Sequence, residues 1–381
     1  MDLKQDIKNA LLIKRLSVIK PAKKFIKHDY LVPGGPYDEQ WDWDGFFIGM
    51  SLTSEPNSMK ILLKYWCLNY LENINNNGFT PGLITPNGID KRLKHIKPFL
   101  AQGIYFYSKF SNDYKWIKPY WSKLKKSVLY HEKKDLDTKT GLNCWHDSME
   151  SGVDNNVALL NYPNRGVIAV DLNTFLYREY KAMTLIAKKL KLKEEKYFKK
   201  RADSIKKLIL KNLWGPEDKS FYNIKKKSRK FIKKITYSNF LPLWSKLLDH
   251  KRGQKVIKKY LLNPQHMKAK YGIRSLSRQD PKYNQKNIIK PHSNWQGPVW
   301  PIANYIYMHI LLNYGFKKQA LWLAETISQL CLDDIKKTGG MHENYNSETG
   351  QPLAAPDFVS WNILVGQMIE ECENNNNPFK I

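Results

Sequence analysis

Apolar residues recur at helical spacing along most of the 381-residue chain, and this periodicity limits its fold more than any other feature. The pattern predicts helices at 58–73, 98–110, 114–132, 171–190, 194–213, 242–248, 253–262, 299–314, 317–332 and 358–371. Strand signals are few and short, chiefly at 221–224 and 231–235. Polar loops rich in glycine and aromatic residues separate alternate pairs of helices. The sequence therefore favours an all-α fold of helical hairpins arranged in a ring, with the functional residues in loops at one end.

No change in composition marks a linker, so we expect a single domain. A basic, amphipathic segment followed by irregular chain forms a lead-in at 1–36, and the ring of helices spans 37–373. The last residues, 374–381, begin with a run of asparagines and are predicted to be frayed.

The cysteines and the N-terminus indicate a cytoplasmic protein. Four cysteines lie far apart with no CxxC spacing, so we expect free thiols and no zinc site: Cys67, Cys144, Cys331 and Cys372. The N-terminal residues lack the apolar core of a signal peptide, and no apolar run has the length of a membrane span.

The formal charge of +28 would attract nucleic acid or acidic lipid if it were concentrated on one face. The excess is mostly lysine and is scattered along the chain. The dense run at 191–207 alternates with an apolar stripe, as on the solvated side of a helix, and the run at 225–234 resembles a hairpin tip. We therefore expect neither a specific nucleic-acid partner nor a membrane partner.

Two loops carry the residues suited to chemistry. The central loop, 145–156, contains an indole, several carboxylates, two amides and a glycine without helical or strand periodicity. The downstream loop, 339–346, opens with two glycines and places Glu343 beside an aromatic ring. Two carboxylates that face each other across a cleft are what hydrolysis of a glycosidic bond requires. We expect these loops to form a carbohydrate site.

Seven short blocks extend the pattern over nearly the whole chain. They are YDEQWDWD at 37–44, ESGVDN at 150–155, DLN at 171–173, FLPL at 240–243, GIRS at 272–275, WQGPVWP at 295–301 and ENY at 343–345. In this order they resemble glycoside hydrolase family 63 and its relatives, the mannosylglycerate and glucosylglycerate hydrolases, with trehalases more distant. One block alone is weak, but seven in order are specific.

The resemblance implies an (α/α)6 barrel, the six-hairpin toroid, that hydrolyses its substrate with inversion and without a cofactor or metal. Asp154 matches the position of the family's general acid and Glu343 that of its general base. Asp44 matches the family's sugar-binding aspartate, with Tyr37 and Trp41 lining the same subsite.

Further substrate contacts are predicted in and beside the blocks, because indole faces suit the C–H surfaces of a pyranose and amides suit its hydroxyls. They are Gln102, Trp145, Gly152, Asn155, Trp295, Gly297, Trp300 and Tyr345. An inverting site also requires its two carboxyl groups to stand roughly 6.5–9.5 Å apart.

The chain departs from the family at three places. Gln296 stands where the family often has arginine. Thr85 and Pro86 stand where the glycerate-specific hydrolases have Pro-His, and the run 97–99 (KPF) replaces Gln-Pro-Pro. These changes bear on the aglycone and on one sugar contact, for which Gln102 could substitute.

Simpler interpretations remain for single residues. Asp154 and Asp44 could each cap a helix, and Glu343 could be an exposed loop acid. Asp147 and Glu150 fit supports of the central loop, with Glu150 second in line as the acid. The histidines near the blocks, His146, His292 and His342, lack a metal-binding spacing, so we expect them to form hydrogen bonds.

The leading hypothesis is an inverting α-glycosidase that acts on a small soluble glucoside or mannoside, such as mannosylglycerate, glucosylglycerate or a short α-oligosaccharide. A trehalase is the alternative within the class. Two alternatives lie outside the glycosidases: a sugar epimerase with the same barrel fold and a non-catalytic sugar-binding protein. They remain open because one fold hosts many functions.

Overall fold

The structure is a computed structural model that describes residues 2–89, 94–290 and 293–381. The chain gathers into two compact units, each built from separate stretches of sequence. Unit 1 comprises Met1–Ser17, Trp145–Asp171 and Leu210–Asn377, and unit 2 comprises Val18–Cys144, Leu172–Ile209 and Pro378–Ile381. Within the described ranges, no helix is both long and apolar enough to cross a membrane.

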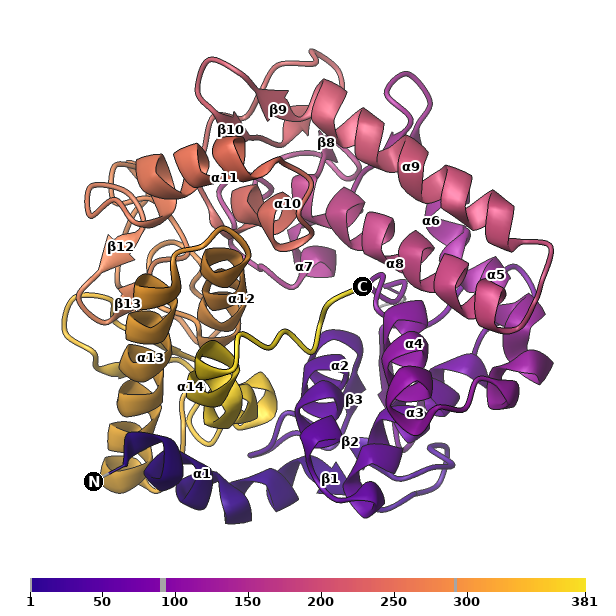
Figure 1. Ribbon diagram of the computed structural model, residues 1–381, viewed down its shortest axis with the longest axis horizontal. Coiled ribbons are helices and arrows are strands. Elements are labelled where there is room, and N and C mark those ends of the chain that lie inside the picture. Colours follow the sequence, from indigo (N-terminus) through magenta and orange to yellow (C-terminus); the bar gives the residue numbers. More distant parts are fainter. Residues whose placement is uncertain (1, 90–93, 291–292) are drawn as a thin grey trace. The chain divides into compact units, whose positions relative to one another are not determined.

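Unit 2 is built on helices with short antiparallel strand pairs between them. Its helices are α2 (Asp42–Ser51), α3 (Asn57–Leu71), α4 (Leu100–Ser111), α5 (Trp121–Val128), α6 (Tyr130–Lys134) and most of α8 (Val170–Lys189) and α9 (Glu195–Asn212). Its strands are β1 (Ile19–Lys20), β2 (Tyr30–Leu31), β3 (Gln40–Trp41), β4 (Leu83–Thr85), β5 (Gly88–Ile89), β6 (Leu136–Asp137) and β7 (Leu142–Asn143). Helix α3 packs against both α2 and α4 (Figure 1). Strands β3, β4 and β5 form a three-stranded sheet that leads directly into α2.

Unit 1 is likewise built on helices with short antiparallel strand pairs between them. Its helices are α1 (Leu3–Lys14), α7 (Ser148–Ser151), α10 (Leu241–Trp244), α11 (His250–Val256), α12 (Pro301–Asn313), α13 (Lys317–Thr338) and α14 (Val365–Glu373). Its antiparallel pairs are β8 (Val167–Ile168) with β11 (Ile224–Lys225), β9 (Trp214–Gly215) with β10 (Ser220–Phe221), β12 (Lys268–Ala269) with β13 (Gly272–Ile273), and β14 (Asn344–Tyr345) with β15 (Pro352–Leu353). Helix α13 packs against α12 and α14, and α1 lies across α13 and α14 (Figure 1).

Most of the predicted helices are present, although 242–248 is reduced to the single turn of α10 and 253–262 is divided between α11 and a π-helix, Ile257–Leu261. Two further differences are informative. The predicted helix at 114–132 is broken into a 3-10 segment, Lys115–Tyr120, followed by α5 and α6. Pro119 lies inside that segment, where its missing N–H and fixed φ disfavour a regular α-helix. The predicted helix at 317–332 continues to Thr338, where Gly339 ends it in the left-handed conformation with φ +81°.

The end of the chain is packed and not frayed. Phe379 is 1% exposed, and its ring lies 5.9 Å from Phe46, 5.5 Å from Phe47 and 6.0 Å from Phe106. The guanidinium of Arg178 donates to the Phe379 carbonyl at 2.6 Å. The asparagine run suggested disorder, but the aromatic residue after it has a cluster of rings to pack on.

Candidate active site

The central loop is folded around the single turn of α7. Asp147 caps this turn, because its side chain accepts the backbone N–H of Glu150 at 2.9 Å. The Glu150 side chain in turn accepts the N–H of His146 at 2.6 Å. Gly152 ends the turn with φ +76°, a conformation that favours glycine. The prediction that Asp147 and Glu150 support this loop is confirmed.

Asp154 follows this turn and is half-buried. Residues 154–161 form mainly turns, and the next helix, α8, begins only at Val170. The interpretation of Asp154 as a helix cap is therefore wrong.

A second segment, 293–297, lies beside the central loop, and we call it the bridging segment. Asn155 accepts the N–H of Trp295 on its side-chain oxygen at 2.6 Å, and its carbonyl accepts the side-chain amide of Gln296 at 2.9 Å. The oxygen of the Gln296 side chain accepts from Asn284 Nδ2 at 3.1 Å. At the position where the family often has arginine, this chain therefore uses neutral hydrogen bonds to hold the bridging segment to the central loop.

Three of the sequence blocks meet through backbone pairing. Val299 forms isolated β-bridges with Arg274 on one side and with Tyr345 on the other. The Val299 N–H donates to the Tyr345 carbonyl at 2.8 Å, and the Tyr345 N–H donates back at 2.9 Å. This ladder fixes the downstream loop beside the chain that follows the bridging segment.

Glu343 is half-buried in the downstream loop, and its neighbours are fixed by one buried aspartate of α13. Asp334 Oδ2 accepts the Tyr345 hydroxyl at 2.8 Å and lies 2.9 Å from Nδ1 of His342. Burial raises the pKa of Tyr345 well above its ordinary value, so its phenol stays a neutral donor. The expected hydrogen-bonding role of His342 is confirmed.

Ser293 links the two carboxylates. Its backbone N–H donates to Asp154 Oδ2 at 3.1 Å, and its hydroxyl donates to Glu343 Oε2 at 3.0 Å. The backbone nitrogen and hydroxyl oxygen of one serine lie within about 4 Å of each other. The bonded oxygens of Asp154 and Glu343 are consequently no more than about 10 Å apart, a limit compatible with the roughly 6.5–9.5 Å of inverting glycosidases.

The tryptophan and tyrosine rings near these loops are closely packed and buried. Trp295 and Trp300 stack with centroids 3.9 Å apart at 12°, and they are 2% and 1% exposed. Trp145, 2% exposed, donates its indole N–H to Asp171 Oδ1 at 2.8 Å. Tyr345 is fully buried. The rings of these residues are covered by protein in this structure, and their contact with a sugar stays a prediction.

Two more of the predicted substrate-binding residues, Asn155 and Gly297, have a structural role. The side chain of Asn155 is 5% exposed and is occupied by the bridging segment. Gly297 has φ +151°, and a Cβ at this position would lie 2.2 Å from the carbonyl oxygen of Asn284. Glycine is required there by the close approach of the backbone.

In unit 2, the predicted sugar subsite begins with Tyr37 and Trp41, which are half-buried. Asp44 is 8% exposed and lies in the first turn of α2. The helix starts at Asp42 with Trp41 at the N-cap position, so the interpretation of Asp44 as the cap is wrong.

The other two positions at which the chain departs from the family form local contacts in unit 2. Lys97 forms a buried ion pair with Asp42, Nζ to Oδ1 at 3.1 Å. The Thr85 hydroxyl donates to the Gly88 carbonyl at 2.9 Å and thereby closes the turn between β4 and β5. Both replacements stabilise the chain locally.

Gln102 lies in the core, and its contact with a sugar stays a prediction. It is fully buried; its amide nitrogen donates to the Pro98 carbonyl at 2.6 Å, and its oxygen accepts from Arg178 at 2.9 Å. The Glu179 carboxylate accepts the N–H groups of Ala101 and Gln102 at 2.7 and 3.2 Å, which holds the start of α4.

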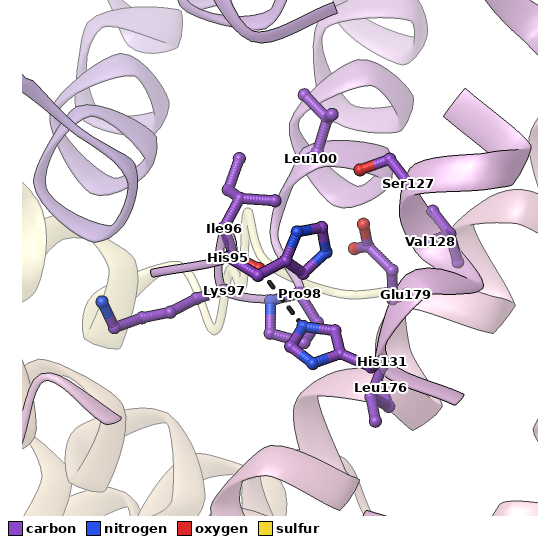
Figure 2. Close-up of a pocket in the computed structure, with 10 residues that line it drawn as sticks. All are labelled: His95, Ile96, Lys97, Pro98, Leu100, Ser127, Val128, His131, Leu176 and Glu179. Atoms are coloured by element: carbon purple, nitrogen blue, oxygen red, sulfur yellow. Dashed lines mark hydrogen bonds between the residues drawn. The ribbon is translucent and has the colours of Figure 1, made fainter. Parts of the chain in front are cut away.

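A small pocket of about 10 Å³ lies beside Glu179 in unit 2 (Figure 2). His95, His131 and Glu179 gather around it, while the amine of Lys97 extends away from them. Burial raises the pKa of Glu179 to about 7, and burial lowers the pKa of His95 well below its usual value. A volume of this size suffices for about one water molecule, so the pocket cannot admit a sugar.

The part of the chain that the structure describes has no group of three or more His, Cys, Asp or Glu side chains able to hold a metal ion. His146 lies with Nδ1 3.0 Å from Asp147 Oδ2, in line with the expected hydrogen bonding, and His292 lies outside the described residues. The four cysteines are buried and form no disulfide.

Sequence reasoning missed Ser293 and Asp334. Asp334 lies on the buried face of α13, and an aspartate on a mainly apolar helix face was the available signal. The sequence contained no such signal for Ser293, because a serine next to a motif is common. Only the position of Ser293 in space gives it two carboxylate partners.

The family of the chain follows from its match to known proteins. A family model described as "Mannosylglycerate hydrolase MGH1-like glycoside hydrolase domain" matches residues 37–361. The chain belongs to this family. The match covers Asp154, Ser293 and Glu343 together with all seven sequence blocks, so the predicted resemblance is confirmed.

Two curated relatives of this MGH1-like glycoside hydrolase are distant in sequence. A mannosyl-oligosaccharide glucosidase from Saccharomyces cerevisiae is 26% identical over 321 residues, 76% of this chain and 36% of that protein. A mannosylglycerate hydrolase from Rubrobacter radiotolerans is 25% identical over 189 residues, 50% of this chain and 40% of that protein. The matches thus span well under half of the length of either relative.

Solved structures share the fold of the MGH1-like chain. The GH63 mannosylglycerate hydrolase from Thermus thermophilus, in complex with glucose, matches with a TM-score of 0.75 and 19% identity over 93% of this chain and 99% of that one. The neutral trehalase Nth1 from Saccharomyces cerevisiae matches with a TM-score of 0.67 and 16% identity over 92% and 76%. The predicted all-α, six-hairpin (α/α)6 fold is confirmed.

Proposed function

We propose that the chain is an inverting α-glycosidase that hydrolyses a small soluble glucoside or mannoside, with Asp154 as the general acid and Glu343 as the general base. The observation that carries the proposal is the placement of two half-buried carboxylates on either side of Ser293, in a chain of a glycoside hydrolase family.

In this mechanism Asp154 donates a proton to the glycosidic oxygen as the bond to the anomeric carbon breaks. Glu343 removes a proton from a water that attacks the opposite face of the sugar. The half-buried setting of both groups limits competing water and strengthens their interaction with the reacting atoms. No cofactor takes part in the proposed reaction.

The substrate is proposed from the relatives. A mannosylglycerate hydrolase among them supports a small glycoside, and the fold shared with a neutral trehalase supports trehalose as the second candidate. The replacement of the family's arginine by Gln296 favours a substrate without a strict need for a cationic contact at that position.

The test is proton NMR of the protein incubated with mannosylglycerate, glucosylglycerate, trehalose, kojibiose and nigerose. We expect the sugar whose anomeric carbon is attacked by water to appear first as its β-anomer. For trehalose, the second glucose leaves as its α-anomer, so equal amounts of both anomers are expected. Asp154→Asn and Glu343→Gln should each lower kcat by about 10²–10⁴-fold. Asp147→Asn is the matched control in the central loop, because asparagine caps a helix as well as aspartate does, and it should keep most of the activity.

Other outcomes separate the alternatives. Release of the α-anomer first would contradict inversion. Conversion of a sugar without a second product would indicate an epimerase, and sugar binding without turnover would indicate a binding protein.

A further inference from the structure

Ser293 contacts both proposed catalytic groups. It is half-buried, and it presents a backbone N–H to Asp154 and a hydroxyl to Glu343. Serine is one of the few residues that can offer two donors within one residue at this spacing.

We propose that Ser293 is a positioning residue that orients the general base through its hydroxyl and the general acid through its backbone N–H. This inference rests on the proposed roles of Asp154 and Glu343 and adds the residue that sets their geometry relative to each other.

The position of Ser293 is imposed by its neighbours. Asn294, the next residue, donates its side-chain amide to the Lys286 carbonyl and to Asn284 Oδ1, both at 2.9 Å. The Asn294 carbonyl accepts the indole N–H of Trp300 at 2.9 Å. Trp295 is tied to Asn155 at 2.6 Å. The bridging segment is thus fixed directly after Ser293, so the two donors are held in place before a substrate binds.

The contact with Asp154 favours one orientation of the acid. Because the N–H of Ser293 donates to Oδ2, this oxygen is the acceptor and the proton is best carried by Oδ1. As Oδ1 gives up its proton, negative charge grows on the carboxylate and the bond from the N–H becomes stronger. The bond therefore contributes more in the transition state than in the ground state.

The contact with Glu343 acts on the ground state. A hydroxyl that donates to Oε2 favours the ionised carboxylate, the form required of a general base. It also restrains the rotation of the carboxylate.

The experiment compares Ser293→Ala, Ser293→Thr and Ser328→Ala on the glycoside that the wild type cleaves. Ser293→Ala removes the hydroxyl and keeps the backbone N–H. We expect kcat to fall roughly ten-fold with KM within about two-fold, since this is the loss expected when one hydrogen bond to a charged group is removed. The acidic limb of kcat against pH should move up by roughly one pH unit, because the ionised base loses a donor.

The two other variants are controls. Ser293→Thr keeps a hydroxyl and should restore kcat and the pH profile to near those of the wild type. Ser328 is fully buried on α13 and donates to the Val365 carbonyl at 3.4 Å, so Ser328→Ala should change stability alone. Thermal melting of all variants shows whether a loss of kcat reflects loss of folded protein.

The outcomes distinguish this inference from the proposed function. If Asp154→Asn and Glu343→Gln are inactive while Ser293→Ala keeps the wild-type kcat and pH profile, the positioning role is overturned and the catalytic roles stand. If Ser293→Ala raises KM alone, the residue is a substrate contact, which also overturns it. If the two carboxylate variants remain active, the catalytic roles fail and the inference fails with them.

Discussion

Lys97 is tied to Asp42 by both its backbone and its side chain. The Lys97 N–H donates to Asp42 Oδ2 at 2.7 Å, and its ammonium lies 3.1 Å from Oδ1. The two side chains are only 11% and 2% exposed. The aspartate lies at the start of α2, so the pair fixes this helix, which begins within the predicted sugar-binding block, to the chain that precedes α4.

Removal of one partner of this ion pair should destabilise the protein strongly. Asp42→Ala leaves the Lys97 ammonium buried without its counter-ion, and we expect the free energy of unfolding to fall by about 3–5 kcal/mol. Lys97→Met should cost less, because Asp42 keeps two backbone N–H donors, those of Trp43 and of residue 97. Urea unfolding measures the loss in each variant.

The control is the exposed Lys199–Asp203 pair, whose side chains are 69% and 60% exposed. Its disruption by Lys199→Ala should change the free energy of unfolding by less than about 1 kcal/mol. An equal effect of Asp42→Ala and Lys199→Ala would contradict the structural role of the pair.

The sequence predicted the helices well because helical periodicity is local. Helix α9 (Glu195–Asn212) agrees with the predicted 194–213 within one residue at each end. The Asp42–Lys97 pair joins residues that are 55 positions apart, and no local pattern encodes such a contact.

The site was predicted less completely, for the same reason. The two loops with their carboxylates were found from composition, and the seven blocks agreed with the family. Burial of Trp145, Trp295 and Trp300 was not foreseen, because a loop has no periodicity that separates a covered ring from an open one. The role of Ser293 depends on three loops meeting in space, which one-dimensional spacing does not show.

Phe379 should contribute to stability as a core residue does. Phe379→Ala removes a ring that packs on Phe46, Phe47 and Phe106, and we expect a loss of about 3–5 kcal/mol in the free energy of unfolding. Phe110, 39% exposed at the end of α4, is the matched control, and Phe110→Ala should cost less than about 1 kcal/mol. Equal, small losses for both variants would show that the end of the chain is not part of the core in solution.

Glu179 should make stability depend on pH in a defined direction. Burial raises the pKa of its carboxyl to about 7 in the folded protein, above the ordinary value of 4.5. Between these values the folded state binds a proton that the unfolded state has released. The contribution of Glu179 to the free energy of unfolding therefore grows as the pH falls from about 7 to 4.5, by up to roughly 3 kcal/mol.

The neighbours of Glu179 require a comparison with Glu179→Gln. His95, whose pKa is lowered by burial and by the nearby His131, acts in the opposite direction below its ordinary value of 6.5. Arg178 and Cys67 also lie close enough to interact with the carboxylate. The difference in urea-unfolding free energy between the wild type and Glu179→Gln, measured from pH 4.5 to 8, isolates the contribution of Glu179. A difference that stays constant over this range would contradict the raised pKa.

Substitution of Gly297 tests whether activity requires the close packing of the bridging segment against residues 283–285. A Cβ at this position would lie 2.2 Å from the Asn284 carbonyl oxygen, 2.8 Å from Gln285 Nε2 and 2.9 Å from a ring carbon of Tyr283. Since the first of these is a backbone atom, Gly297→Ala must displace one of the two segments. The displacement should move Ser293, four residues upstream, relative to Asp154. We expect stability to fall by more than the roughly 1–2 kcal/mol that left-handed strain alone costs an alanine, and kcat to fall at least about ten-fold.

Gly315 supplies the matched control for this substitution. It also has a left-handed φ, +83°, but the nearest atom to an added Cβ is 3.6 Å away, on His250. Gly315→Ala should therefore carry the strain alone, with kcat unchanged on the same substrate. Because both variants place an alanine at a positive φ and only Gly297→Ala adds the clash, the ratio of their kcat values reports mainly the effect of displacing the bridging segment. Equal kcat values for the two variants would mean that the reaction tolerates movement of Ser293, whereas a selective loss in Gly297→Ala would tie the rate to the position of this segment.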